Sequence, residues 1–155
     1  MMFNKNLKNI LLVIFATLIL SACSTAKKSG NIDGDVYTGK ETVKFLASGV
    51  PDRIFFATNK SSLTTAARET LRKQATYLRK NKSLNVTIEG HADERGTREY
   101  NLALGQRRAE AVSDYFVLNG ISKDRITVRS YGEERPLAYG QDEESYSKNR
   151  RVEIN

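Results

Sequence analysis

IEGHADERGTREYNLALGQRRAEAV, residues 88–112, is the densest run of polar and charged residues in the chain. Its start completes an alternating apolar and polar segment over 84–90, the pattern of a half-buried strand. Its end begins a helical pattern over about 101–118, which Gly120 terminates. Residues 90–97 between them are predicted to form an exposed polar loop at the edge of a rigid scaffold, where binding residues tend to lie.

Similar patterns extend on both sides of this run. Strands are predicted at 53–56, 84–90, 126–131 and 150–154, and helices at 64–80, 101–118 and 142–149. The inner side of the second helix is predicted to consist of Leu102, Gly105, Ala109, Val112 and Phe116. Strands that alternate with helices indicate an α/β fold, here an α+β sandwich in which helices cover one small mixed sheet of about four strands.

The N-terminus has the pattern of a secretory signal peptide. Lys5 and Lys8 precede an apolar run from Ile10 to Leu20, which is shorter than the ~20 apolar residues of a transmembrane helix. A short membrane anchor that is never cleaved is the alternative. Cys23 is the only cysteine, so an intrachain disulfide is excluded.

Residues 20–23, Leu-Ser-Ala-Cys, resemble the lipobox of bacterial lipoproteins. The resemblance implies a covalent lipid on Cys23, with three acyl chains that form a lasting anchor, and no other cofactor. Ser24 follows the cysteine, and a residue other than Asp there implies the outer membrane, with the anchor in its inner leaflet and the domain in the periplasm.

Composition divides the chain into three regions. We predict a signal peptide over 1–22, a lipidated N-terminus and flexible tether over 23–52, and one folded domain over 53–155. A tether of this length has an rms reach near 30 Å and spans roughly 90 Å when stretched. Without Lys5 and Lys8 of the signal peptide the net charge falls from +7 to +5, which favours acidic partners without naming one. An exported, lipid-anchored chain rarely meets nucleic acid.

The polar run, together with Ser130-Tyr131-Gly132 and Asn149-Arg150-Arg151, closely resembles the OmpA-like domain family over about residues 53–155. The resemblance implies a noncatalytic domain that binds peptidoglycan and joins the outer membrane to the cell wall. In that family the ligand is diaminopimelate, whose side chain ends in an ammonium and a carboxylate. Relatives with a lipobox also bind the periplasmic propeller protein TolB and belong to the Tol system, which acts in envelope integrity and cell division.

The resemblance assigns roles by position. Asp93 would accept hydrogen bonds from the ligand ammonium, and Arg108 would form a bidentate contact with its carboxylate. Arg95, Gly96 and Thr97 match the ligand-lining loop. Thr58 and Asn59 occupy the turn after the first strand. The family often has an acidic residue and two aromatics around this turn, and the sequence here, Phe55-Phe56-Ala57-Thr58-Asn59, departs from that pattern. Arg98 stands where the family often has proline.

Other interpretations use the same residues. A wall hydrolase with Glu94 or Glu89 as general acid and Asp93 as its partner is the enzymatic alternative, but no nucleophile motif or metal site supports it. His91, the only histidine, lacks the partners of a zinc site, so we expect it to make structural hydrogen bonds. Residues 149–151 are expected to be structural, with one arginine bound to nearby carboxylates.

Overall fold

The computed structural model describes residues 36–37 and 45–155, all within one compact unit, Ile32–Asn155. The predicted signal peptide, Cys23 and most of the predicted tether lie outside these residues. Among the helices of the described part, none combines the length and apolar character that crossing a membrane requires.

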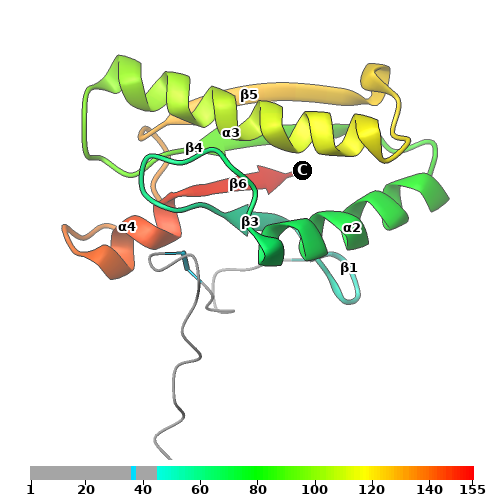
Figure 1. Ribbon diagram of the computed structural model, residues 1–155, viewed down its shortest axis with the longest axis horizontal. Helices are drawn as coiled ribbons and strands as arrows, with labels where there is room; N and C mark the ends of the chain where they lie inside the picture. Colours follow the sequence, from blue (N-terminus) through cyan, green and yellow to red (C-terminus); the bar gives the residue numbers. More distant parts are fainter. Residues whose placement is uncertain (1–35, 38–44) are drawn as a thin grey trace, which may run out of the picture. The chain divides into compact units, whose positions relative to one another are not determined.

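A four-stranded mixed sheet forms the centre of this unit, in the order β3–β6–β4–β5 (Figure 1). The strands are β3 (Arg53–Phe55), β4 (Val86–His91), β5 (Ile126–Gly132) and β6 (Arg151–Ile154). β6 pairs antiparallel with both β3 and β4, whereas β4 and β5 are parallel. Parallel neighbours need a crossover connection, and helix α3 supplies it. The four strands that the sequence predicts are confirmed.

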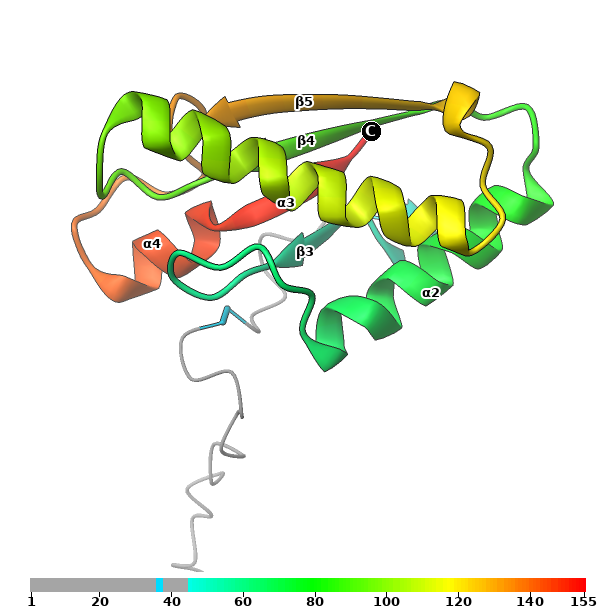
Figure 2. The ribbon, with the colours of Figure 1, turned by 45° about the horizontal axis from the view of Figure 1, so that its top comes forward.

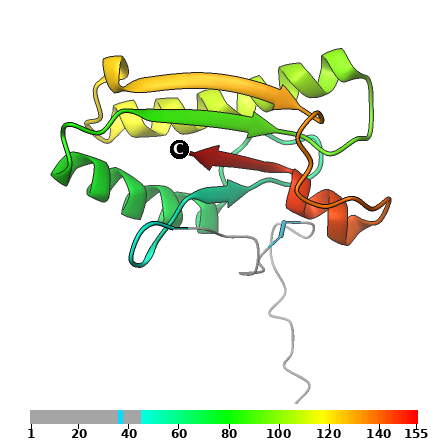
Figure 3. The same cartoon turned by 180° about the vertical axis from the view of Figure 1, so that it is seen from behind.

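Two long helices, α2 (Thr65–Lys80) and α3 (Arg98–Leu118), lie side by side over one face of the sheet (Figures 1 and 2). A short helix, α4 (Glu143–Asn149), leads into β6, and a 3₁₀ turn, Lys123–Arg125, leads into β5. Seen from behind, the opposite face carries no helix of the described residues (Figure 3). The predicted sandwich of one sheet and a helical layer is therefore confirmed.

The core fills the space between the sheet and the two helices. Alternate strand residues point into it, namely Ile54, Val86, Ile88, Val152 and Ile154. The helices contribute Ala67, Leu71, Ala75, Leu78, Ala109, Val112 and Phe116. α3 passes so close to β4 that a Cβ on Gly90 would lie 1.9 Å from the carbonyl oxygen of Gly105. Glycine at these positions lets the helix approach the strand that carries the polar run.

The beginning and inner side of α3 differ from the prediction. The helix begins at Arg98, three residues early, because the Thr97 side chain accepts a hydrogen bond from the Tyr100 amide and caps it. The prediction that Leu102 faces inward is wrong: Leu102 is 39% exposed, whereas Leu104 is 3% exposed. Polar Asn101 and Arg108 also lie on the buried side, so an apolar pattern alone could not define this face.

A small hairpin precedes the sheet, ahead of residue 53 at which the sequence suggests that order begins. It pairs β1 (Phe45–Ala47) with β2 (Val50–Pro51), and β2 packs against α2. Tyr37 also contacts the domain, since its ring lies edge-on to that of Phe55 at 4.9 Å between centroids. Parts of the predicted tether therefore rest on the folded unit.

Candidate functional site

Arg108 is fully buried, with 0% of its surface exposed; its hydrogen bonds all go to backbone oxygens, and its guanidinium lies 5.2 Å from the centroid of the Phe56 ring. Its Nε donates to the carbonyl of Lys60 at 2.8 Å, Nη1 to that of His91 at 2.8 Å, and Nη2 to that of Ala57 at 3.0 Å. Burial, followed by the nearby Arg150 charge, lowers the pKa of Arg108 to about 10, so the side chain stays charged at neutral pH. Arg108 thus joins α3 to the turn after β3 and to the end of β4.

Asp93 follows the end of β4 by two residues and is also buried. Its carboxylate accepts hydrogen bonds from the Arg95 amide, Nε and Nη2, at 3.1, 3.1 and 2.7 Å. The Nη1 of Arg150 donates a further bond at 3.3 Å. Burial alone would raise the pKa of Asp93, but these bonds outweigh it and hold the pKa below its ordinary value. Asp93 is therefore an anion.

Arg95 is the outermost member of this group, with 41% of its side chain exposed. Besides Asp93, it donates to the Thr58 hydroxyl at 3.3 Å, lies 3.6 Å from the Glu143 carboxylate, and stacks over the Tyr146 ring at 4.4 Å. Its partners come from three different segments. Arg95 therefore bridges the turn after β3, the loop after β4 and α4.

Arg150 lies behind this group and is 1% exposed. It donates to the carbonyl of Phe56 at 3.1 Å, to Asp93, and to Glu143 at 2.5 Å. Arg151 contacts Glu153 at 2.6 Å, and the Asn149 side chain accepts bonds from the amides of Leu137 and Ala138. The expected structural role of residues 149–151, with an arginine bound to carboxylates, is confirmed.

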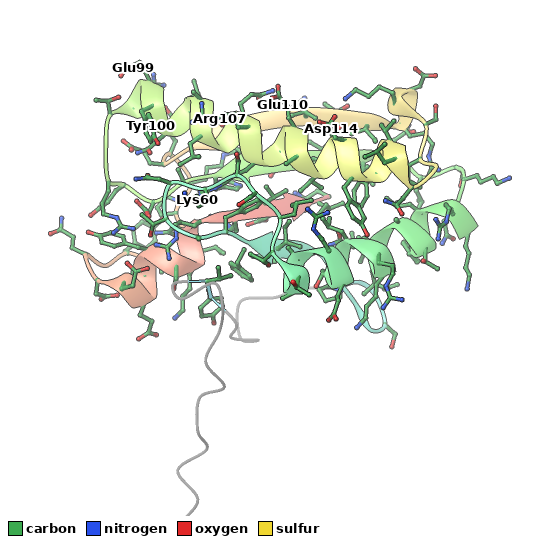
Figure 4. The ribbon with its side chains drawn as sticks, viewed as in Figure 1. Lys60, Glu99, Tyr100, Arg107, Glu110 and Asp114 are labelled. Atoms are coloured by element: carbon green, nitrogen blue, oxygen red, sulfur yellow. The ribbon has the colours of Figure 1, made fainter. Side chains whose placement is uncertain are left out.

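The remaining predicted site residues lie in the same two loops. Asn59 adopts a left-handed conformation, φ +54°, in the turn that the hydrogen bond from the Lys60 amide to the Ala57 carbonyl closes. Gly96, with φ +110°, precedes the capping residue Thr97. Figure 4 shows Lys60 on this turn, below Tyr100 and Arg107 of α3. The structure thus brings the turn after β3 next to the first half of α3.

His91 departs from its predicted role. The side chain is 2% exposed, and neither ring nitrogen has a hydrogen-bond partner among the described residues. Its ring stacks on Tyr131 at 5.6 Å between centroids. Burial, then the charges of Arg151, Arg135 and Arg53, lower the pKa of His91 to about 3. The expectation of side-chain hydrogen bonds is wrong, because this imidazole packs as a neutral ring; the backbone carbonyl of His91 accepts a hydrogen bond from Arg108.

The carboxylates proposed for hydrolysis do not form an acid and base pair. Glu94 accepts from the Tyr146 hydroxyl, and Glu89 lies on the sheet at 3.5 Å from the Tyr131 hydroxyl. Asp93 between two arginines is held deprotonated. Within residues 36–37 and 45–155, no three His, Cys, Asp or Glu side chains are grouped to hold a metal ion.

The pairing of Asp93 with Arg95 and with Arg150 was not predicted from the sequence. Arg150 lies 57 residues from Asp93 along the chain, and no local pattern links the two. Nor does a local pattern show that Arg108 has backbone partners in the turn after β3 and at the end of β4. Both depend on the antiparallel pairing of β6 with β3 and β4, which places the start of β6 beside the end of β4.

Comparisons with known proteins define the class of this fold and site. The OmpA family matches residues 55–150. The peptidoglycan-associated lipoprotein of Brucella melitensis is 42% identical over 148 residues, which cover 92% of this chain and 88% of that protein. The chain belongs to the OmpA family, and within it to the peptidoglycan-associated lipoproteins, a noncatalytic group.

Solved structures of related proteins have the same fold. The peptidoglycan-associated lipoprotein of Burkholderia pseudomallei aligns with TM-score 0.65 and 39% identity, covering 66% of this chain and 87% of that one. The cell wall anchor of the T6SS from Pseudomonas aeruginosa aligns with TM-score 0.57 and 31% identity, over 66% of this chain and 76% of that one.

The buried neutral imidazole predicts a pH dependence of stability. The folded pKa of His91, about 3, lies below the unfolded value of 6.5, so the unfolded state binds more protons between these values. Stability should therefore fall on acidification from pH 6.5 to 4.5, by about 2–3 kcal/mol from this group. His91→Phe keeps a ring against Tyr131 and should remove that part of the loss. Urea unfolding at both pH values measures it, and an equal loss in both proteins would contradict the assignment.

Proposed function

We propose that this chain binds peptidoglycan through the diaminopimelate of its peptide stems and thereby tethers the outer membrane to the cell wall. The observation that carries the proposal is a buried anion, Asp93, in the loop after β4, whose charge acts on a buried cation, Arg108, of α3. A ligand that ends in both an ammonium and a carboxylate matches this pair of charges. Membership of the peptidoglycan-associated lipoproteins supports the same ligand.

The ammonium would bind where Arg95 now donates. Arg95 is the most exposed cation at Asp93, and its guanidinium can move into water at little cost, whereas the buried Arg150 cannot. When the ligand ammonium replaces the Arg95 guanidinium, the Asp93 carboxylate still has a cationic partner. It would also break the contact between Arg95 and the Thr58 hydroxyl and so loosen the turn that contains Thr58 and Asn59.

The ligand carboxylate would bind the part of Arg108 that the protein leaves unused. A guanidinium has five N–H donors, and the three carbonyl contacts of Arg108 use three, which leaves one on each Nη atom. Because Arg108 is fully buried, a carboxylate would reach it only after the Arg95 side chain moves. Gly96 and Thr97, at the start of α3, would line the ligand with backbone groups.

The proposed function also includes a lipid anchor, a location at the outer membrane and a protein partner. We infer that Cys23 carries the lipid, that the anchor lies in the inner leaflet of the outer membrane, and that the domain faces the periplasm. The likeness to peptidoglycan-associated lipoproteins also supports a TolB-like propeller protein as a partner, within the Tol-Pal system of envelope integrity and cell division.

Asp93→Asn tests wall binding. The variant keeps the shape of the side chain and removes the charge that would pair with the ammonium, so affinity for purified sacculi should fall by more than about tenfold. A pull-down on sacculi, with and without free diaminopimelate, measures it. Asp124→Asn, an exposed acid on the 3₁₀ turn before β5, is the matched control and should bind normally.

Circular dichroism of both variants would establish that they are folded. Wild-type binding by folded Asp93→Asn would rule out the Asp93 site. Arg108→Ala is a poorer test, since it strips three carbonyls of their donor and so changes the fold together with the ligand contact.

Cys23→Ser tests the anchor. With the only cysteine removed, cells fed radiolabelled palmitate should show no label on the protein, whereas the wild-type chain should be labelled and should fractionate with the outer membrane. Label on the variant, or wild-type protein found only in the inner membrane, would contradict the assignment.

A further inference from the structure

The outer side of α2 is strongly basic. Its exposed cations, with one that follows the helix, are Arg68, Arg72, Lys73, Arg79, Lys80 and Lys82, and we call this set the basic face. Glu69 is the only acidic residue between Thr65 and Lys82. The buried side of the same helix is Ala67, Leu71, Gln74, Ala75 and Leu78, so the cations are confined to the arc that faces away from the core.

The basic face accounts for the positive charge of the folded part of the chain. Residues 45–155 contain 19 Lys and Arg against 15 Asp and Glu, whereas residues 65–82 contain six against one. The remainder is therefore close to neutral. On the opposite edge, the labelled acids Glu99, Glu110 and Asp114 lie along the outer side of α3 (Figure 4). The positive charge is thus concentrated on α2, whereas α3 exposes cations, Arg98 and Arg107, together with these acids.

A groove of about 350 Å³ lies between α2 and the β1–β2 hairpin. Arg72, Lys73 and Lys80 line it together with Thr76 and Tyr77, and Gly49 and Val50 close the hairpin side. Arg79 is held by its bonds to the Asn119 carbonyl and the Thr76 hydroxyl. Among the described residues, none of the three groove cations is in an ion pair, so their charge is available to an anionic partner.

The basic face lies near the predicted lipid anchor along the sequence, which favours a membrane surface as the anionic partner. The hairpin that forms the groove is the first described element after Tyr37, and Tyr37 itself contacts β3 through Phe55. Thirteen residues separate Tyr37 from Cys23, and they span no more than about 50 Å even when fully extended. A lipid on Cys23 would therefore hold Tyr37 within about 50 Å of the leaflet that contains the anchor, so that the basic face can reach the headgroups.

We propose that the basic face docks on the anionic phospholipid headgroups of that leaflet. Basic residues near an anionic surface strengthen binding roughly fivefold each, within a Debye length of about 10 Å. The short tether raises the effective concentration of the surface, so contacts that are weak in solution become effective. The proposal relies on lipidation of Cys23 and is independent of the diaminopimelate site.

Docking on the leaflet would give the domain a second surface to bind besides peptidoglycan. The residues that line the groove come from 49–50 and 72–80, and none of them belongs to the Asp93 group or to the turn that contains Thr58 and Asn59. Contact with lipid through the groove would therefore use other residues than Asp93 and Arg95. The domain would turn its basic edge to the membrane while the ligand site stays available to peptidoglycan.

Vesicle co-sedimentation tests this docking. The chain from residue 23 onward, carrying Cys23→Ser and so free of lipid, contains the whole compact unit. It should bind vesicles in which one third of the lipid is phosphatidylglycerol, bind pure phosphatidylcholine vesicles poorly, and dissociate as salt rises. Arg72→Gln/Lys80→Gln should weaken binding to the anionic vesicles roughly thirtyfold.

The matched control is Arg107→Gln/Arg129→Gln, which removes the same charge from exposed positions on α3 and β5 and should bind vesicles like wild type. Equal loss in both double variants would show a nonspecific charge effect and overturn the proposal, as would equal binding to neutral and anionic vesicles. Sacculus pull-down separates the two functions: Arg72→Gln/Lys80→Gln should still bind sacculi. Loss of sacculus binding with normal vesicle binding would assign the face to the wall instead.

Discussion

The binding of one buried cation by three backbone carbonyls organises the polar end of this domain. Arg108 projects from α3 and donates to the carbonyls of Ala57 and Lys60 in one loop and of His91 at the end of β4. An ion without partners in such a place would cost several kcal/mol, so the two segments must stay where their carbonyls meet it. Asp93 follows His91 by two residues, and its position depends on the same contacts.

Charge pairing then explains why this end of the sheet contains so many arginines. Asp93 compensates Arg150 directly and stabilises the charge of Arg108 at longer range. Arg95, which is partly exposed, completes the pairing of Asp93 in the ligand-free protein. A ligand ammonium can replace Arg95 without leaving the anion bare, which is a physical reason for having one mobile cation among fixed ones.

The strands and the two long helices followed from apolar periodicity, because most of the core is made of regularly spaced apolar side chains. The start of α3 and the buried position of Leu104 in place of Leu102 did not, since polar Asn101 and Arg108 occupy its inner side. The assignment of Asp93 and Arg108 to the ligand site came from the resemblance to the OmpA-like family. The backbone partners of Arg108 arise from contacts across the sheet that no local pattern records.

The two proposed surfaces face different parts of the envelope, with the basic face of α2 toward lipid and the Asp93 group toward peptidoglycan. The most direct test of the wall-binding account is a crystal structure of the domain with a peptidoglycan fragment that contains diaminopimelate. The account predicts the ligand ammonium at Asp93 in place of Arg95, and the carboxylate on the Nη atoms of Arg108, which keeps its three carbonyl bonds. A bound fragment that leaves the Arg95–Asp93 pair intact and does not touch Arg108 would contradict it.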